Sequence, residues 1–323
     1  MNTIPIVFAF DRSWSNPACV CLFSLMINAH KTTFYDIFII HSKSEPINKV
    51  NLDIIPQHFN NCRIQYIEVD NVFDHSYEIR GITTTTYYRL LIPLLIQQYD
   101  KIIYSDVDVI FRNDLWSIYN STDLSDAYIA GVNTLSHYIP DLKLYYEKQI
   151  GIDPSKIIYA GNIILNSKAI RDDGIIDVFI RKSNETFRFQ DMDIINIVCS
   201  GKIKYLPPSF CVTTYFSDFL VNKREELLKV WEEEELKQAE NYGIIHYNGQ
   251  KPWKGYCINF DIWWEYYRKS PYYNAKYYYD FFYNKLNEFD TLPLSKRLKI
   301  LARYFIVGQK NYVNTTLVSG KNS

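Results

Sequence analysis

The sequence predicts an α/β protein with a mainly parallel central sheet. Short apolar runs of strand length alternate with stretches of helical spacing, and this is the pattern of βα units. The chain has 323 residues, of which 47% are hydrophobic, so it can bury a large core. Acidic residues directly follow two of the apolar runs. In such folds the ligand-binding groups lie just beyond the carboxyl ends of the strands.

Composition excludes several classes of protein. The 35 basic side chains balance the 36 acidic ones, so no nucleic-acid partner is expected. The six cysteines form no C-x-x-C pair, and a core of this size needs no disulfides, which favours free thiols in a reducing compartment. We read no signal peptide and no apolar stretch of about 18 residues that could span a membrane. We therefore expect a cytoplasmic protein, either free or peripheral on the inner face of the cytoplasmic membrane.

The first 70 residues contain three predicted strands and one predicted helix. Residues 4–10 form an apolar run that ends at Asp11, and residues 18–29 have apolar positions at helical spacing. Residues 35–41 and 64–69 are the next two strands. This order predicts the first βα units of the sheet.

A threonine run, residues 83–86, supplies N-cap candidates for a helix over residues 87–98. Pro93 either kinks this helix or marks its true start. Arg89 is a single charge in an apolar and aromatic segment, and it either pairs with a core carboxylate or binds an anion.

Residues 99–111 contain two carboxylates one residue apart, Asp106 and Asp108, between apolar stretches. In extended backbone, side chains at i and i+2 point to the same face, so both could hold one hard cation through oxygen ligands. The alternative is an acidic strand end with two solvated aspartates. The apolar neighbours favour the cation, because unpaired carboxylates are costly beside a core.

Two further strands are predicted over residues 127–132 and 157–166, the second containing a glycine where a ligand or backbone could approach closely. A helix over residues 189–196 carries Asp191 and Asp193 in its first turn. Stabilisation by the helix dipole explains these acids as well as a functional role does.

Residues 224–240 are strongly charged and predict a solvated surface helix. The following segment, residues 244–253, leads from an apolar pair into His, Gly, Lys, Pro and Trp. A single histidine is usually structural, but His246 and Lys251 in a loop shaped by glycine and proline suggest a metal ligand beside a phosphate contact.

The last third of the chain has a different character. Residues 263–268 and 277–286 are aromatic and compatible with helices, and from residue 291 onward there are six Lys or Arg and no acid. Residues 292–307 form a basic amphipathic segment that could lie on an anionic membrane or dock on the domain. We predict a catalytic domain over residues 1–257 and a helical region over residues 258–323, with membrane contact through residues 291–307.

Four features occur in a fixed order between residues 4 and 253. They are the first strand ending in Asp11, Thr-Thr-x-x-Arg ending at Arg89, the D-x-D pair, and the His-x-x-Gly…Lys-Pro-Trp loop. In this set the chain resembles glycosyltransferase family 8, the retaining family that includes glycogenin and the bacterial lipooligosaccharide α-galactosyltransferases and glucosyltransferases. The resemblance implies a GT-A fold, a Rossmann-like mixed sheet with a helical C-terminal extension, that uses a UDP-sugar and Mn²⁺.

The resemblance also implies the roles of individual residues. Asp106, Asp108 and His246 would be the metal ligands, and carboxylates with an imidazole suit Mn²⁺ better than Mg²⁺, which is the alternative. The other residues implied in binding the UDP-sugar are Ala9, Asp11 and Trp14 at the uracil, Val107 between the aspartates, Gly249 and Lys251 at the diphosphate, and Arg89, Asn162 and Asp191 at the sugar. The catalytic candidates are Arg89, Asp191 and Asp193.

The chemistry explains these residue types. Cleavage of the anomeric bond leaves a UDP diphosphate whose growing charge must be neutralised, and a divalent cation with Lys251 would do so. A phosphate oxygen of the departing UDP could accept the proton of the acceptor hydroxyl.

The chain departs from the family pattern at three places. Met192 stands where the galactosyltransferases carry Gln, so front-face retention and attack by Asp193 both remain open. Tyr159 replaces the usual Asn, which leaves Asn162 as the substitute sugar contact. The loop is one residue short between Gly249 and Lys251.

These features predict a hexosyltransferase that moves galactose or glucose from UDP-galactose or UDP-glucose to a glycan or glycolipid acceptor in bacterial lipopolysaccharide biosynthesis. A haloacid-dehalogenase-like phosphatase is the alternative enzyme, with Asp106 as nucleophile and Asp108 as acid and base. That fold usually starts with this strand, whereas roughly 100 residues precede it here. A non-catalytic sugar-nucleotide-binding protein is the third possibility.

Overall fold

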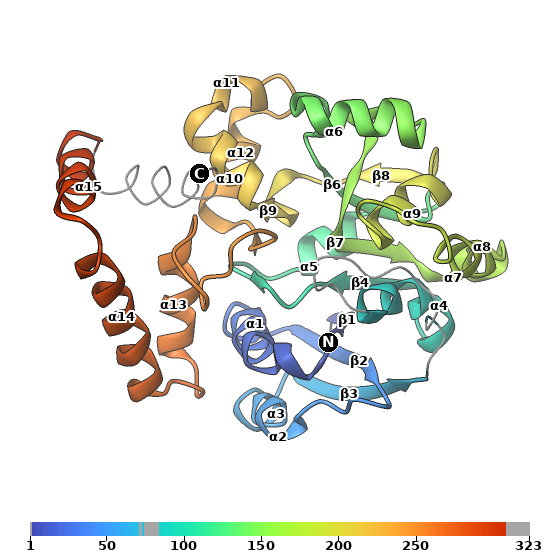
Figure 1. Cartoon of the computed structure of the whole chain (residues 1–323). Coiled ribbons are helices and arrows are strands. Elements are labelled where there is room, and N and C mark those ends of the chain that lie inside the picture. Colours follow the sequence, from blue (N-terminus) through green and yellow to red (C-terminus); the bar gives the residue numbers. More distant parts are fainter. Residues whose placement is uncertain (1, 71–72, 74–83, 308–323) are drawn as a thin grey trace.

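The structure is a computed structural model that describes residues 2–70, 73 and 84–307. At its centre lies a seven-stranded sheet with the order β3-β2-β1-β4-β7-β6-β8 (Figure 1). The first four strands in this order are parallel, whereas β7 runs antiparallel to both β4 and β6. The predicted α/β class is confirmed, and the sheet is mixed but mainly parallel, because β7 runs against the other six strands of this sheet.

Six strands of the central sheet match the predicted apolar runs within a few residues, whereas β8 was not predicted. Their bounds are β1 Asn2–Ala9, β2 Thr33–Ser42, β3 Cys62–Val69, β4 Lys101–Ser105, β6 Ile129–Asn133, β7 Ile158–Asn166 and β8 Ile203–Tyr205. A second, three-stranded sheet has the order β5-β10-β9 and consists of two-residue strands. These are β5 Val109–Ile110, β9 Val212–Thr213 and β10 Ile245–His246.

Helices cover both faces of the central sheet. The α-helices up to β9 are α1 Ser15–Ile27, α2 Lys49–Leu52, α3 Ile55–His58, α4 Ile92–Leu95, α5 Trp116–Ser121, α6 Pro140–Tyr145, α7 Ser167–Asp172, α8 Ile175–Lys182 and α9 Asp191–Val198. Those after β9 are α10 Thr214–Asn222, α11 Arg224–Leu227, α12 Glu233–Tyr242, α13 Phe260–Lys269, α14 Ala275–Asp290 and α15 Leu294–Val307. Short 3-10 helices are η1 Arg12–Trp14, η2 Thr84–Leu91, η3 Ser136–Tyr138, η5 Pro154–Lys156 and η6 Pro208–Phe210, and η4 Tyr146–Ile150 is a π-helix.

Two large apolar clusters lie on opposite faces of the sheet. Strand β1 contributes to both, because successive side chains alternate between the faces: Ile6 and Phe8 join one cluster and Val7 joins the other. The first cluster includes buried side chains of α1 and α13, and the second includes those of η2, α8 and α9. The sheet thus lies between two layers of helices, each packed through one of the apolar clusters. The edge at which β1 and β4 end carries polar side chains.

Two predicted helices are different in the structure. Instead of one helix over residues 87–98, the chain forms η2 followed by the short α4, and Pro93 lies in the first turn of α4. Pro93 thus marks the start of a helix, since its ring fits the first turn but not the interior. Thr83 lies outside the described residues.

The charged segment 224–240 was expected to be one solvated helix, and this prediction was wrong. The chain forms two helices, α11 and α12, and Leu227, Leu236 and Ala239 are fully buried in the first apolar cluster. The four consecutive glutamates conceal this apolar face, because they occupy the start of α12 and its capping box.

The C-terminal helices α13 to α15 follow one another along one side of the molecule (Figure 1). Trp264 of α13 is buried in the first apolar cluster, and aromatic side chains of α14 pack against that cluster from outside. The predicted helices in this region are confirmed, while the domain boundary at residues 257 and 258 stays a prediction. Within the described ranges, no helix is long and apolar enough to cross a membrane. All six cysteines are free and buried.

Candidate functional site

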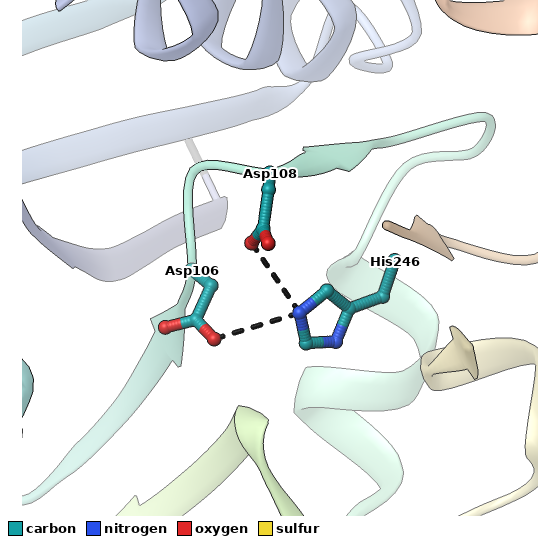
Figure 2. Close-up of side chains that lie close together, drawn as sticks. All are labelled: Asp106, Asp108 and His246. Atoms are coloured by element: carbon teal, nitrogen blue, oxygen red, sulfur yellow. Dashed lines mark ion pairs between the residues drawn. The ribbon is translucent and has the colours of Figure 1, made fainter. Parts of the chain in front are cut away.

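Three side chains that are distant in the sequence converge beyond the end of β4. Nε2 of His246 lies 3.5 Å from Oδ2 of Asp106 and 3.3 Å from Oδ1 of Asp108. Figure 2 shows both carboxylates directed at the same nitrogen of the imidazole ring. The structure therefore brings together the three residues for which a shared metal was predicted.

The backbone of both sheets positions this group. Asp106 directly follows β4, and its amide donates a 2.7 Å hydrogen bond to the carbonyl of Gly161 in β7. Asp108 directly precedes β5, which pairs antiparallel with β10, so His246 lies opposite Val109. The segment between the two aspartates is a bend and not an extended strand, yet both side chains still reach the same place.

Gly161 leaves the space that this group occupies. A Cβ atom at residue 161 would lie 2.3 Å from Cε1 of His246 and 2.6 Å from Oδ2 of Asp106. No side chain could be accommodated there without moving the two ligands, because real Cβ atoms do not approach other heavy atoms so closely. The glycine noted in the predicted strand over residues 157–166 is therefore required for a close approach of side chains.

Burial and charge act against each other in this group. Burial by itself disfavours a charged His246, but the carboxylate of Asp108 outweighs it and raises the pKa of His246 to about 10. Burial also opposes ionisation of Asp108, yet Lys251 and His246 hold its pKa well below the usual range. The other ring nitrogen of His246, Nδ1, lies 3.6 Å from Sγ of Cys211, a contact that fixes the ring orientation.

The donor set fits a divalent cation. One ligand atom from each of Asp106, Asp108 and His246 lies within 4.8 Å of the other two. Two carboxylates and an imidazole suit Mn²⁺ and related transition metals better than they suit Mg²⁺. Among the described residues, this is the one group of three or more such ligands that meets that distance.

Arg89 links two of the predicted carboxylates. It is buried, and its guanidinium lies 2.9 Å from Oδ1 of Asp106 and 3.1 Å from Oδ2 of Asp191. It also donates to the carbonyls of Thr86 and Ala160 at 2.9 and 2.8 Å. Arg89 thus pairs with core carboxylates, the first of the two roles considered from the sequence.

Asp191 and Asp106 each have a second polar partner. Thr86 donates to Oδ1 of Asp191 at 2.8 Å, and Tyr104 donates to Oδ1 of Asp106 at 2.7 Å. Burial raises the pKa of Asp191 to about 6 even though Arg89 lies beside it. The residue before Asp191, Gln190, has φ 47° and ψ −117°, a strained backbone conformation at the entrance to α9.

Lys251 and Trp14 lie on the other side of Asp108. Nζ of Lys251 is 2.5 Å from Oδ2 of Asp108 and 5.4 Å from the centroid of the Trp14 ring. Trp14 makes an edge-on contact with Trp253 at 5.8 Å between ring centroids. Asp11 caps the short helix that carries Trp14, accepting from the amide of Ser13 at 2.8 Å.

The remaining predicted residues lie at the end of β1, between β4 and β5, after β10 and in β7. Ala9 ends β1, the side chain of Val107 is buried in the first apolar cluster, and the nearest side chain to Gly249 is that of Thr214. Asn162 is buried beside Ser105, whose hydroxyl lies 2.7 Å from its Oδ1, and its Nδ2 has no hydrogen-bond partner among the residues that the structure describes.

Asp193 differs from the other predicted carboxylates. It is fully buried and accepts hydrogen bonds from the phenols of Tyr145 and Tyr146 at 2.6 and 3.0 Å and from the amide of Phe189 at 2.9 Å. Burial raises its pKa above the usual value despite these donors. Met192 packs against the apolar cluster that contains these two tyrosines and Ile157.

Four residues that support the site were assigned no role in it from the sequence, although one of them, Thr86, belongs to the Thr-Thr-x-x-Arg motif. Thr86 and Tyr104 hold the carboxylates of Asp191 and Asp106, Cys211 contacts His246, and Gln190 carries the backbone strain. A hydroxyl two residues before Asp106 could have been noticed, because i and i+2 share a face of a strand. No sequence signal points to Cys211, which meets His246 only through the pairing of β9 and β10.

Comparison with known proteins adds to this geometry. The model of a family described as "Glycosyl transferase family 8" matches residues 5–257. A Haemophilus influenzae protein named as a candidate glycosyltransferase is 26% identical over 234 residues, covering 71% of this chain and 68% of its own. General stress protein A of Bacillus subtilis is 24% identical over 258 residues, which are 77% of this chain and 86% of that protein.

Solved structures of two glycosyltransferases have a similar fold. The galactosyltransferase LgtC in complex with donor and acceptor sugar analogs matches with a TM-score of 0.67 at 22% identity, covering 85% of this chain and 99% of LgtC. The bifunctional glycosyltransferase WbbM matches with a TM-score of 0.70 at 22% identity. The match covers 85% of this chain and 51% of WbbM, so the chain spans about half the length of that protein.

Proposed function

This chain belongs to glycosyl transferase family 8, and from this premise we propose that it is a retaining hexosyltransferase that uses a UDP-sugar and Mn²⁺. It is a glycosyltransferase with a GT-A fold. The proposed reaction moves galactose or glucose to a glycan or glycolipid acceptor of the lipopolysaccharide type. The observation that carries this proposal is the convergence of Asp106, Asp108 and His246 beside Lys251.

Asp106, Asp108 and His246 would hold the cation in this proposal. When bound, Mn²⁺ would supply Lewis-acid neutralisation of the diphosphate charge that grows as the anomeric bond breaks. Arg89 holds the carboxylate of Asp106 in place through a contact of 2.9 Å to Oδ1, the oxygen that does not face His246. Lys251 supplies a further positive charge to the phosphates.

The nucleotide would lie along the carboxyl edge of β1. We assign the uracil contacts to Ala9, Asp11 and Trp14, since Trp14 offers an aromatic face within 5.4 Å of the Lys251 ammonium. Besides Lys251, the backbones of Val107 and Gly249 would border the diphosphate.

The sugar of the donor would lie toward α9. Asp191 and Arg89 are the proposed sugar contacts, joined to the metal group through the pairing of Arg89 with Asp106. Asn162 carries a buried amide whose nitrogen has no partner within the described part of the chain, which supports a polar contact in this region. The polar atoms of Asp191, Arg89 and Asn162 would select the hexose.

We propose front-face retention instead of attack by Asp193. Both carboxylate oxygens of Asp193 accept hydrogen bonds from tyrosines, and the side chain is fully buried, so it is a positioning residue for the start of α9. The thioether of Met192 is no substitute nucleophile. In the proposed step the acceptor oxygen bonds to the anomeric carbon on the face that UDP leaves, and the acceptor proton passes to a phosphate oxygen of UDP.

The phosphatase interpretation is set aside, because the glycosyltransferase family matches residues 5–257 and includes Asp106 and Asp108. The third possibility, a non-catalytic protein that only binds a sugar nucleotide, is distinguished from the enzyme by a measurement of turnover. A panel of UDP-sugars is incubated with the protein and Mn²⁺, and UDP release is measured for each. An enzyme releases UDP with one hexose preferred, whereas a binding protein is stabilised but releases none.

The metal and nucleotide assignment is tested by thermal unfolding. UDP and Mn²⁺ together should raise the Tm by about 5 °C at saturating concentrations. Asp106→Asn and Asp108→Asn should lose this rise and UDP release alike. No stabilisation of the parent protein by the pair would refute the proposed function.

Membrane contact through residues 291–307 is the last part of the proposal. Four apolar residues of α15 lie four, three and four positions apart on one helix face, and these four are exposed: Leu294, Leu298, Leu301 and Phe305. Lys296, Arg297 and Lys299 lie in the same helix. An apolar face with basic neighbours suits the surface of an anionic membrane, as expected for an enzyme acting on a glycolipid at the inner face of the cytoplasmic membrane.

A further inference from the structure

The ammonium group of Lys251 forms an ion pair with one carboxylate oxygen of Asp108, a proposed metal ligand. Nζ of Lys251 lies 2.5 Å from Oδ2 of Asp108 and also contacts the carbonyl oxygen of Tyr247. The other oxygen of Asp108, Oδ1, faces His246. Asp108 thus has a positively charged partner on one oxygen before any divalent cation is bound.

This contact has an electrostatic consequence. Lys251 and Asp108 are both largely buried, with 17% and 11% of their side chains exposed, so their attraction is screened only weakly by water. A divalent cation held by Asp108 would place two further positive charges near the ammonium. The lysine and the cation therefore compete for the same carboxylate.

The two basic residues around the metal group differ in their freedom to move. Arg89 is anchored by the carbonyls of Thr86 and Ala160 in addition to its carboxylate partners. Lys251 has a flexible four-carbon stem, and its described polar contacts are those to Asp108 and Tyr247. Of the two, Lys251 is the group that can exchange its partner.

We propose that Lys251 is an exchangeable counterion that couples cation binding to nucleotide binding. Without a cation Lys251 neutralises Asp108, and when a divalent cation binds, the ammonium leaves Asp108 and pairs with the diphosphate. Cation and UDP then bind cooperatively, because each favours the same displaced position of Lys251. This inference rests on the proposed function, since it takes Asp108 as a metal ligand and a diphosphate as the second partner.

The coupling is reciprocal by thermodynamic necessity. If UDP tightens Mn²⁺ binding by a given factor, Mn²⁺ tightens UDP binding by the same factor. Replacement of Lys251 by an uncharged residue removes the group that competes with the cation for Asp108. It also removes the proposed partner of the diphosphate. The affinity for Mn²⁺ alone should therefore rise, while the effect of UDP on that affinity should shrink.

The experiment measures free Mn²⁺ by electron paramagnetic resonance during titration of the full chain, with and without UDP. In the parent protein, UDP should tighten Mn²⁺ binding about tenfold or more. Lys251→Met should bind Mn²⁺ alone about tenfold more tightly than the parent, with the UDP effect reduced to about twofold. Lys251→Arg keeps the positive charge and should bind Mn²⁺ alone as weakly as the parent.

Lys254→Met is the matched control. Lys254 lies three residues further along the same segment and is exposed, so its loss changes the net charge equally without uncovering Asp108. This variant should follow the parent in both titrations. Circular dichroism and thermal unfolding verify that each variant is folded.

Two results would overturn the inference, and they differ from failure of the proposed function. If folded Lys251→Met binds Mn²⁺ alone no more tightly than the parent, Lys251 does not compete for Asp108. An unchanged UDP effect in that variant would show that the lysine does not couple the two ligands. If instead the parent protein binds no Mn²⁺ even with UDP, the proposed function and the inference both fail.

Discussion

Arg89 and Asp36 are both buried charged residues, but only Arg89 contacts a proposed metal ligand. Arg89 holds a proposed metal ligand, whereas Asp36 joins strands β2 and β3 away from it. The carboxylate of Asp36 accepts from Nε and the terminal nitrogen of Arg63 at 2.5 and 2.6 Å. It also accepts from Gln65 at 2.8 Å and Tyr99 at 2.7 Å. Both clusters follow the same rule, that a buried charge is stable only with its partners in place.

Asp36→Asn is predicted to lower the free energy of unfolding by about 2 kcal/mol at pH 7. Burial alone would raise the pKa of Asp36, but the donors that surround it hold the pKa below its usual value near 3.8. The charged form therefore contributes its full stability above pH 3.8, and this is lost as the pH falls through the lower pKa of the folded state. Urea unfolding at pH 7 and pH 2.5 should show a difference between parent and variant that shrinks in acid.

Asp70→Asn is the control for this measurement. Asp70 forms an exposed ion pair with Lys43 at 3.4 Å, so its loss should change the free energy of unfolding by less than about 0.5 kcal/mol. Equal effects of the two substitutions at pH 7 would contradict the assignment of Asp36.

Arg89→Lys is predicted to destabilise the protein by roughly 3 kcal/mol and to weaken Mn²⁺ binding. A lysine has one ammonium and cannot reach the carboxylates of Asp106 and Asp191 and both carbonyls together, which leaves buried acceptors unpaired. Thermal unfolding and Mn²⁺ titration measure the two effects.

Arg112→Lys separates stability from metal binding. Arg112 donates to the carbonyls of Gly243 and Ala239 at 2.8 and 2.9 Å, and none of the proposed metal ligands is among its partners. The Arg112→Lys variant should have a lower Tm than the parent protein, while its affinity for Mn²⁺ should stay within about twofold of the parent's. Equal loss of Mn²⁺ affinity in both variants would mean that Arg89 acts only through general stability.

At the scale of elements, the close approach of β7 to the metal group depends on a glycine. Gly161→Ala is predicted to weaken Mn²⁺ binding at least tenfold, because the added methyl group would lie 2.3 Å from the ring of His246 and 2.6 Å from Asp106. The protein should still fold, since the two ligands can shift to make room. Mn²⁺ titration without nucleotide, together with circular dichroism, measures both expectations.

Gly249→Ala is the steric control for this element. The nearest atom to a Cβ at residue 249 is Oγ1 of Thr214 at 3.6 Å, an ordinary contact. This variant should bind Mn²⁺ alone like the parent. Unchanged Mn²⁺ affinity in Gly161→Ala would show that the ligands are not fixed where the structure has them.

At the scale of the whole molecule, α15 combines exposed apolar side chains, among them Leu294, Leu298 and Leu301, with basic residues. Truncation after residue 290 is predicted to reduce binding to vesicles that contain phosphatidylglycerol by tenfold or more, because it removes the basic residues and the exposed apolar face. UDP-sugar hydrolysis should persist, since the proposed metal and nucleotide contacts all precede residue 258. Vesicle sedimentation and UDP release measure the two outcomes.

Phosphatidylcholine vesicles are the control for charge, and they should bind the full chain weakly. The double variant Lys296→Gln with Lys299→Gln keeps the apolar face and should lose part of the preference for anionic vesicles. If the truncated and full chains partition equally onto anionic vesicles, α15 is a structural element.

Much of the fold could be predicted from the sequence because its signals are local. Strands such as β2 and β7 were located within two residues by their apolar runs, since the periods of strands and helices act on neighbouring residues. The split of segment 224–240 could not be predicted in the same way. Glutamates dominate the composition of this segment, so it looks solvated. Leu236 is buried because α12 packs against the first apolar cluster, and this contact depends on residues distant in the sequence.

The amino-acid sequence specifies the chemical groups of this protein and their order: Asp11, Arg89, Asp106, Asp108, His246 and Lys251. The resemblance to a family predicted that Asp106, Asp108 and His246 share a metal, but the residues themselves did not show which of the other groups would meet. Asp108 and Lys251 are 143 residues apart and touch only because β5 and β10 pair, while Asp193 is turned to two tyrosines. The tertiary structure decided this, because contacts between distant segments depend on how sheets and helices pack, and packing is a property of the whole chain.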